Sequence, residues 1–288
     1  MITRRDFLQF SAAGLGTLAL SDLAVAFAGL KPFPVGVQLY TVREQAEQDL
    51  GATLAHIAMI GYNEVETYWN VYTHPADKLR KMIVDNGLSV PSGHFDYDGL
   101  ATKFDYAKEL GVKYMICPML PKDMWTSADG FKKAADQFNK WGQQAQGMGM
   151  QFGFHNHNYE FQKFGNVTGF DILTTSTDPK LVCLEMDCYW ITQAGQDPVA
   201  MLKKYGSRIQ LLHLKDRMAG FPTTQMLGPD AEHMTEVGAG TINWKAVLET
   251  AEQTGVKHYF VERDNGKTPA FESLRISYQN LSELVHGK

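Results

Sequence analysis

Four short apolar segments in the second half of the chain each end in a side chain that can bind a metal ion. The segments have the character of buried strands, and the residues that close them are His155, Asp187, His213 and Glu262. Burying an unpaired carboxylate or imidazole is costly, so four of them at equivalent positions indicate one shared cation. Mixed imidazole and carboxylate ligands suit Mn, Co, Zn or Fe. We therefore predict a single divalent metal ion from this group.

The fifth strand offers two imidazoles for this site. His155 and His157 are two residues apart, and side chains two apart in a strand point to the same face. Both are therefore expected to point inward. His155 is the first choice of ligand and His157 is the alternative.

Four strand ends converge in a closed parallel barrel, where active sites lie at the carboxyl ends of the strands. Eight β-rich segments are expected, at 35–40, 62–67, 89–94, 113–118, 151–157, 182–187, 209–214 and 259–263. Segments with helical spacing follow at 45–60, 75–86, 100–110, 128–147, 198–205, 244–254 and 272–285. This order predicts an α/β protein with a single-domain (β/α)8 TIM barrel. An open doubly wound sheet is the alternative, but no GxGxxG or P-loop follows an early strand.

The first residues predict an export signal. The segment TRRDFL at 3–8 has the twin-arginine pattern, and an apolar stretch with small residues follows it. We expect residues 1–28 to be a twin-arginine signal peptide and residues 29–288 to be the barrel domain. The expected location is the periplasm, with no membrane anchor after signal removal. The alternative is a cytosolic protein with an apolar N-terminal helix.

The composition limits the classes of partner and the cysteine chemistry that we expect. The formal net charge is -5, with 44% hydrophobic and 20% charged residues, so there is no basic excess and nucleic acid is not an expected partner. The three cysteines are odd in number and lie in or beside apolar segments, which favours buried thiols over a disulfide framework. The sequence leaves the oligomeric state open.

Residues near the ends of the first three strands are expected to contact the ligand, because barrel strand ends are where ligands bind. These residues are Gln38, Tyr40, Glu66, Trp69 and His94. Trp69, with its neighbour Tyr68, either stacks on the apolar face of a sugar ring or packs within a loop. His94 is expected on a loop after the third strand.

Two further residues have open roles. Glu160, just past the fifth strand, belongs to a solvated loop or contacts a sugar hydroxyl. Lys215, on the same face as His213, either polarises a carbonyl or pairs with Asp216.

Several motifs together resemble the sugar phosphate isomerase/epimerase family of xylose isomerase-like TIM barrels. They are GVQLYTVR, GYNEVE, HNHNYEF, EMDCYW, HLKD, VERD and GAGTINW, spread over nearly all of residues 29–288. The resemblance implies one divalent metal held by Glu, Asp, His and Glu on strands five to eight. Asp187, His213 and Glu262 take the last three places, whereas His155 stands where the family has its first Glu.

The resemblance also implies enolisation next to a carbonyl. In the family the strand-five and strand-eight carboxylates act as bases, so Glu262 is the first catalytic candidate, with His157 and Lys215 beside it. The expected function is a metal-dependent isomerase or epimerase. Its substrate would be a small carbohydrate, an unphosphorylated sugar or keto-sugar, since an exported enzyme meets few sugar phosphates and no phosphate-cradling loop is evident.

Other functions remain open. His155 in place of a carboxylate favours a lyase reaction, either of a 3-keto-glycoside (lyase or hydrolase) or of the inosose dehydratase type. The resemblance to inosose dehydratases, which also have a His-rich strand five, points the same way. A non-catalytic sugar-binding barrel is a further alternative, and the net charge disfavours an endonuclease.

Overall fold

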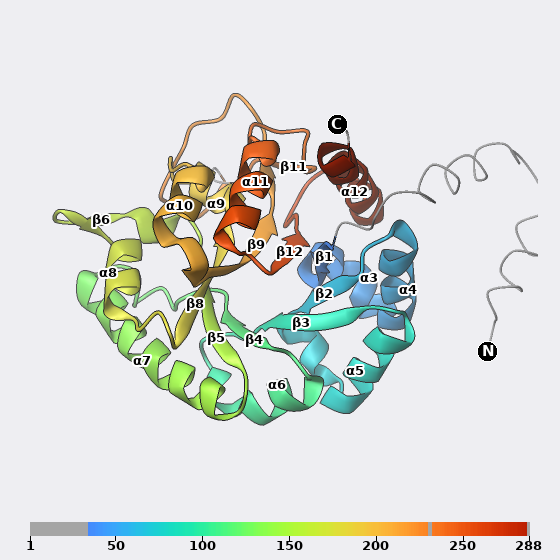
Figure 1. Cartoon of the computed structure of the whole chain (residues 1–288), viewed down its shortest axis with the longest axis horizontal. Helices are drawn as coiled ribbons and strands as arrows, with labels where there is room; N and C mark the ends of the chain where they lie inside the picture. Colours follow the sequence, from blue (N-terminus) through green and yellow to red (C-terminus); the bar gives the residue numbers. More distant parts are fainter. Residues whose placement is uncertain (1–33, 230–231, 287–288) are drawn as a thin grey trace, which may run out of the picture. The chain divides into compact units, whose positions relative to one another are not determined.

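Eight parallel strands close into a barrel in the computed structural model, which describes residues 34–229 and 232–286. Around the barrel the strand order is β1-β12-β9-β8-β5-β4-β3-β2 (Figure 1). The barrel strands are β1 (Gly36–Gln38), β2 (Glu64–Thr67), β3 (Ser89–His94), β4 (Tyr114–Cys117), β5 (Gln151–His155), β8 (Val182–Asp187), β9 (Ile209–Leu214) and β12 (His258–Val261). The predicted fold class is confirmed, and the predicted signal peptide lies outside the described residues.

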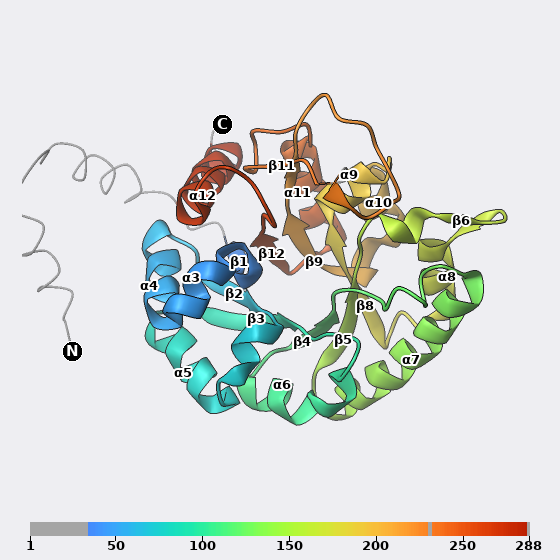
Figure 2. The same cartoon turned by 180° about the vertical axis from the view of Figure 1, so that it is seen from behind.

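Helices surround the barrel, and Figure 2 shows the same ring from behind. They are α3 (Arg43–Gln48), α4 (Leu50–Ile60), α5 (Ala76–Asp85), α6 (Phe104–Leu110), α7 (Ala128–Gly147), α8 (Gly169–Ser176), α9 (Cys188–Gln193), α10 (Pro198–Tyr205), α11 (Trp244–Thr254) and α12 (Ala270–His286). Two small antiparallel hairpins, β6 (Lys163–Phe164) with β7 (Val167–Thr168) and β10 (Asp216–Arg217) with β11 (Met234–Thr235), are additions to the barrel. None of the helices in the described segments is long and apolar enough to cross a membrane.

Side-chain caps explain where several helices begin. The carboxylate of Asp49 accepts from the Ala52 backbone N–H at the start of α4, and Ser127 does the same for α7. Thr168 and Asp171 form a reciprocal capping box on α8. Gly255, with φ of 86°, ends α11 in the left-handed conformation that favours glycine.

The interior of the barrel is layered because inward-facing residues recur at every second position. One apolar layer contains Cys183, Leu211 and Phe260. Two glycines next to this layer, Gly36 on β1 and Gly153 on β5, leave room for it. A Cβ on Gly36 would lie 2.6 Å from Phe260, and a Cβ on Gly153 would lie 2.6 Å from Ile116. Two residues further along the same strands, the apolar layer gives way to charged and imidazole side chains. Because inward-facing residues alternate along each strand, the layer of charged and imidazole side chains lies directly on top of the apolar core.

Some local expectations differ from the structure. Strand β5 ends at His155, so the strand alternation does not extend to His157. His94 is the last residue of β3 and not part of a loop. Helices α8 and α9 were not predicted.

All three cysteines are buried and form no disulfide, as expected.

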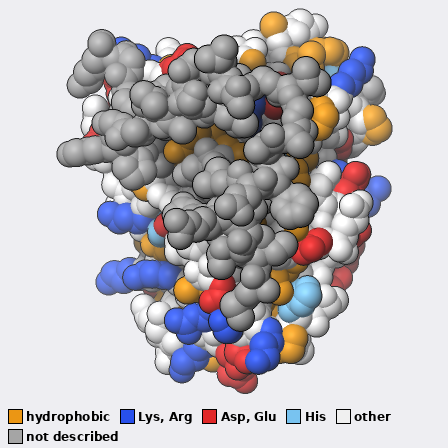
Figure 3. Space-filling view, turned by 90° about the vertical axis from the view of Figure 1, so that its right-hand side faces the viewer, with side chains coloured by type: hydrophobic (Ala, Val, Ile, Leu, Met, Phe, Trp, Pro, Cys, Tyr) orange, Lys and Arg blue, Asp and Glu red, His pale blue; other side chains and the backbone are white. Residues whose placement is uncertain are grey.

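The described part of the molecular face in Figure 3 carries Lys and Arg side chains next to Asp and Glu side chains. This interspersed pattern agrees with the small negative net charge of the sequence.

Candidate metal centre

Three of the four predicted ligands, Asp187, His213 and Glu262, have ligand atoms within 4.8 Å of one another, and the fourth, His155, lies next to Asp187. Nε2 of His155 lies 3.7 Å from Oδ2 of Asp187, and Nδ1 of His213 lies 4.0 Å from the same oxygen. Oε2 of Glu262 lies 2.7 Å from Nδ1 of His213. The strand register contributes directly, because Asp187 and His213 are paired positions of β8 and β9. All four residues are at most 5% exposed.

Asp187 is rigidly held, with one carboxylate oxygen left over. Its Oδ1 accepts from the Trp190 backbone N–H and so caps α9, while its own N–H donates to Oδ1 of Asn156. Its Oδ2 is buried and makes no hydrogen bond, although Nζ of Lys215 lies 3.2 Å away. A buried carboxylate oxygen without a hydrogen bond is costly. This oxygen, two imidazole nitrogens and a second carboxylate form a donor set that fits a divalent transition metal.

Lys215 lies among three carboxylates. Its Nζ is 2.8 Å from Glu262 and 3.0 Å from Asp264, in addition to its contact with Asp187. Burial opposes the charge of Lys215, but Asp187 and its two other partners raise the lysine pKa well above its ordinary value. The side chain is therefore an ammonium ion. It does not pair with Asp216, which was one of its two expected roles.

Asp216 instead organises the glycine-rich GAGTINW segment. Its carboxylate accepts from the backbone N–H groups of Gly238, Gly240 and Ile242 and from Nε1 of Trp244. The motif therefore has a structural explanation in a buried carboxylate that holds the loop before α11.

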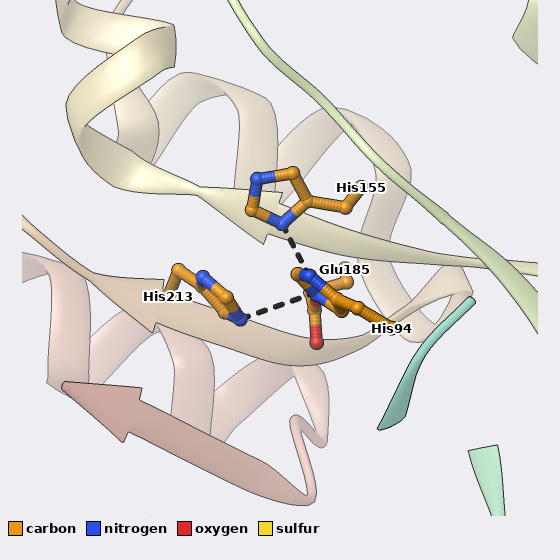
Figure 4. A group of neighbouring side chains, drawn as sticks. All are labelled: His94, His155, Glu185 and His213. Carbon is orange, nitrogen blue, oxygen red and sulfur yellow. Dashed lines mark hydrogen bonds and ion pairs between the residues drawn. The ribbon is translucent and has the colours of Figure 1, made fainter. Parts of the chain in front are cut away.

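A second layer of polar side chains lies beneath the predicted ligands. Oε2 of Glu185 lies 2.7 Å from Nε2 of His94 and 3.0 Å from Nδ1 of His155. Oε2 of Glu66 lies 2.6 Å from Nε2 of His213. Figure 4 shows Glu185 between the rings of His155 and His213. His94, His155, Glu185 and His213 thus form a second buried group whose ligand atoms are close enough for an ion.

Charge in the two layers follows from these contacts. Burial alone would raise the pKa of Glu262, but Lys215 and His213 hold it well below its ordinary value. Burial opposes the charge of His94 as well, yet Glu66 and Glu185 raise its pKa to about 10. Glu262 is therefore a carboxylate and His94 an imidazolium near neutral pH in the metal-free protein.

A cavity of about 570 Å³ opens above the predicted ligands, within the range of about 300–1,000 Å³ that is typical of small-molecule sites. Its wall includes Tyr40, Trp69, His94, His157 and Lys215, which the sequence predicted as site residues. His155 and Glu262 also line it, so the predicted metal ligands have access to a bound molecule. Trp69 is 38% exposed, and its ring lies 5.6 Å from that of Tyr40, which gives the cavity an aromatic wall.

Three predicted ligand contacts lie elsewhere. Gln38 and Glu66 are fully buried, bonded to each other, and not among the residues that line the cavity. Glu160 is also fully buried, which differs from the expected solvated loop. Its Oε2 accepts from the backbone N–H of His157. The physical reason is that residues 159–161 form a 3-10 turn that packs inward beside the barrel.

His157 occupies the cavity wall in an unusual state. Its ring packs against Trp190, and its Nδ1 is buried without a hydrogen-bond partner. Burial, reinforced by the charge of Lys215, lowers the pKa of His157 to about 3. The ring is therefore a neutral imidazole whose Nδ1 has no partner within the protein and can accept a hydrogen bond or a proton.

Sequence reasoning missed Glu185, Asp264 and Ser92 as members of the site. Glu185 had a detectable signal, because it shares the inward face of β8 with Asp187. Asp264 lies two residues after Glu262, beyond the end of β12, so strand alternation gives no signal for it. Ser92, whose Oγ donates to Glu66 over 2.5 Å, has no signal of its own in the sequence.

Comparison with known proteins agrees with this architecture. Inosose dehydratases from Clostridium beijerinckii and Geobacillus thermodenitrificans are 23% and 24% identical to this chain, covering 78% and 80% of it and 86% and 88% of their own lengths. A solved sugar phosphate isomerase/epimerase from Parabacteroides distasonis superposes with a TM-score of 0.72 at 25% identity, covering 88% of this chain and 95% of that one.

A crystal structure of the IOLI protein with a bound zinc atom superposes with a TM-score of 0.67 at 17% identity, covering 88% of this chain and 99% of that one. This similarity concerns the fold. The family model described as xylose isomerase-like TIM barrel matches residues 54–279, most of the chain. The chain therefore belongs to the xylose isomerase-like TIM barrel family.

Proposed function

We propose that this protein is a metal-dependent enzyme that removes a proton next to the carbonyl group of an unphosphorylated sugar or keto-sugar. The observation that carries the proposal is the buried Oδ2 of Asp187, which makes no hydrogen bond, is paired with Nζ of Lys215 at 3.2 Å, and faces His155 and His213. His155 and Lys215 connect this oxygen to the cavity, which both of them line. His155, Asp187, His213 and Glu262 would hold the metal. When bound, such an ion stabilises negative charge that develops on a carbonyl oxygen.

The chain supplies both a base and an acid for this chemistry. Glu262 is ionised and His157 is neutral, so either can accept the proton from the carbon next to the carbonyl. Glu262 is the first candidate because it lies at the strand-eight position of the family's base. The ammonium of Lys215, at the cavity wall, can stabilise the resulting oxyanion or return a proton. Return of the proton to carbon gives an epimer or an isomer.

The charges of the cavity wall support an unphosphorylated substrate. Among the described residues that line it, the cations other than histidine are Arg43 and Lys215. Both are engaged, since Arg43 donates to the backbone oxygens of Tyr40 and Asp264, and Lys215 is paired with carboxylates. Asp96, Glu232 and Asp264 add carboxyl groups to the same wall. The imidazolium of His94, which also lines the wall, is paired with Glu66 and Glu185, so no described cation of this wall is free to bind a phosphate dianion.

A dehydratase is the second candidate, and the relatives favour it. The inosose dehydratases match most of this chain. In this chain His155 also stands in place of one of the two carboxylates that act as bases in the family. Epimerisation uses a base on each face of the substrate carbon, whereas dehydration requires one base and one acid. In this reaction the base takes the proton next to the carbonyl, and the neighbouring hydroxyl leaves as water after it gains a proton from Lys215.

The experiment is to incubate the protein and Zn²⁺, Mn²⁺ or Co²⁺ in D2O with ketoses, keto-inositols and 3-keto-glycosides. Mass spectrometry then measures deuterium uptake, isomerisation, water loss and aglycone release. We expect exchange at the carbon next to the carbonyl in at least one class, and a loss of that exchange in Glu262→Gln. Reaction of 3-keto-glycosides alone, with release of the aglycone, would favour a lyase acting on glycosides. If no carbonyl sugar reacts, a sugar-binding role displaces the enzyme.

A further inference from the structure

We infer that Glu185 and Glu66 are positioning residues that fix the two ligand imidazoles by accepting a hydrogen bond from the ring N–H opposite the metal. The inference rests on the proposed metal centre and assigns a role to a carboxylate layer that has none in the proposed chemistry. The same layer contains four close ligand atoms, so the rival interpretation is a second metal site.

Each ligand imidazole presents one nitrogen to the outer layer, which contains Asp187 and Glu262. It presents the other nitrogen to the inner layer, which contains Glu185 and Glu66. In His155, Nε2 faces Oδ2 of Asp187 at 3.7 Å, while Nδ1 faces Glu185 at 3.0 Å. In His213, Nδ1 faces Glu262 at 2.7 Å and Asp187 at 4.0 Å, while Nε2 faces Glu66 at 2.6 Å. The two rings thus use opposite nitrogens for the outer layer. A carboxylate that accepts from the remaining N–H selects the tautomer and the ring orientation of a ligand histidine.

The distances distinguish the inner contacts from those around Asp187. In the inner layer the carboxylate-to-imidazole distances of 2.6, 2.7 and 3.0 Å have the length of hydrogen bonds. Between Asp187 and the two ligand histidines the distances of 3.7 and 4.0 Å exceed that length. In the outer layer the contact of Glu262 with Nδ1 of His213, at 2.7 Å, is equally short. Protons account for these short contacts in the metal-free protein, and an ion fits the wider separation around Asp187. An ion in each layer would also require both His155 and His213 to bridge two metals.

The inner carboxylates are themselves held in place. Glu66 accepts from Nε2 of Gln38 over 2.8 Å and from Oγ of Ser92. These three residues are paired positions on β1, β2 and β3, so the barrel register sets the network. Glu185 is the register partner of His155 on β5. Both carboxylates are fully buried, so their hydrogen bonds do not compete with solvent.

The test compares Zn²⁺ binding by the wild type, Glu185→Gln, Glu66→Gln and Glu185→Asp, with stoichiometry from elemental analysis and affinity from competition with a chromophoric chelator. Glu64→Gln is the matched control, because Glu64 lies 2.8 Å from Nδ1 of His258 outside the centre. We expect one Zn²⁺ per chain. Each inner Glu-to-Gln change should weaken binding by about 10- to 100-fold, with partial recovery in Glu185→Asp and no change in the control.

Nitrogen-15 NMR of the Zn²⁺-loaded wild type gives a second measurement if a variant does not fold. We expect ring protons on Nδ1 of His155 and Nε2 of His213, and the opposite tautomers would overturn the inference. Affinity within twofold of wild type in both Gln variants would also overturn it. Two Zn²⁺ per chain, with one lost in Glu185→Gln, would establish the rival metal site. Failure of the wild type to bind Zn²⁺, Mn²⁺ or Co²⁺ would instead remove the proposed metal centre itself.

Discussion

The ammonium of Lys215 lies 2.8 Å from the carboxylate of Glu262, and both side chains are at most 6% exposed. The cation thus stands against the carboxylate proposed as both metal ligand and base. It also contacts Asp187 and Asp264, so a single ammonium group is shared by three carboxyl groups. Because Lys215 reaches the cavity, it can act on a bound sugar as well as on its carboxylate partners.

Changing Lys215 to Met keeps most of the stem volume and removes the charge. We expect kcat to fall by about 10²-fold or more because an acid near the substrate oxygen is lost. Metal content should be retained, since the ligands remain. Steady-state kinetics and elemental analysis check this, with the exposed Lys133→Met on α7 as the control. Wild-type kcat in Lys215→Met would show that the lysine only balances charge.

Removing the carboxylate of Asp216 should destabilise the loop before α11. The Asp216→Ala variant leaves the N–H groups of Gly238, Gly240 and Ile242 and the indole of Trp244 without their acceptor. We expect the free energy of unfolding to fall by about 3 kcal/mol, since each buried donor without a partner costs about 1–3 kcal/mol and water can reach some of them. Urea denaturation measures the change. The exposed Asp98→Ala provides the comparison, and equal stability of the two variants would contradict the role.

Burial raises the pKa of Glu160 from its ordinary 4.5 to about 8. The folded protein therefore binds more protons than the unfolded chain between these two values. The corresponding stability is present below about pH 4.5 and is lost as the pH rises through 8. In Glu160→Gln this loss should disappear. Relative to the variant, the wild type should lose about 4 kcal/mol between pH 5 and pH 9, measured by urea unfolding. Parallel pH profiles would show that Glu160 is ionised when folded.

Export remains a proposal that rests on the twin-arginine pattern at Arg4 and Arg5. Replacing both with Lys should leave the protein in the cytoplasm, because the translocase that reads this signal requires the arginine pair. Cell fractionation followed by immunoblotting measures the distribution, and N-terminal sequencing of the exported form locates the cleavage site. Undiminished periplasmic yield of the double variant would mean that the pattern is accidental.

The barrel was predictable because its eight strands are apolar segments separated by helical spacing. All eight were located, and their ends differ from expectation by at most a few residues. Helix α9 was missed because CYWITQ follows β8 without a break and is as apolar as the strand. Helix α8, with its two threonines, lacks a strong helical composition, and its capping box is a short local signal.

The outer residues of the site were also predictable, since each closes an apolar segment. The inner layer was not, because a hydrogen bond between Glu66 and His213 depends on how strands far apart in sequence face each other across the barrel. Glu66 and Gln38 were therefore assigned to a ligand and not to each other. Glu185 was within reach of the period-two pattern, but only packing shows that His155 lies against it.

The central claim is that His155, Asp187, His213 and Glu262 bind one divalent metal. The most direct measurement is the metal content of purified wild type, Asp187→Ala and His213→Ala by elemental analysis, with circular dichroism to verify the fold. His155→Ala and His157→Ala, measured in parallel, identify the fifth-strand ligand, which we expect to be His155. We predict about one metal ion per chain in the wild type and almost none in folded Asp187→Ala and His213→Ala. Full metal occupancy in both of these variants would contradict the account.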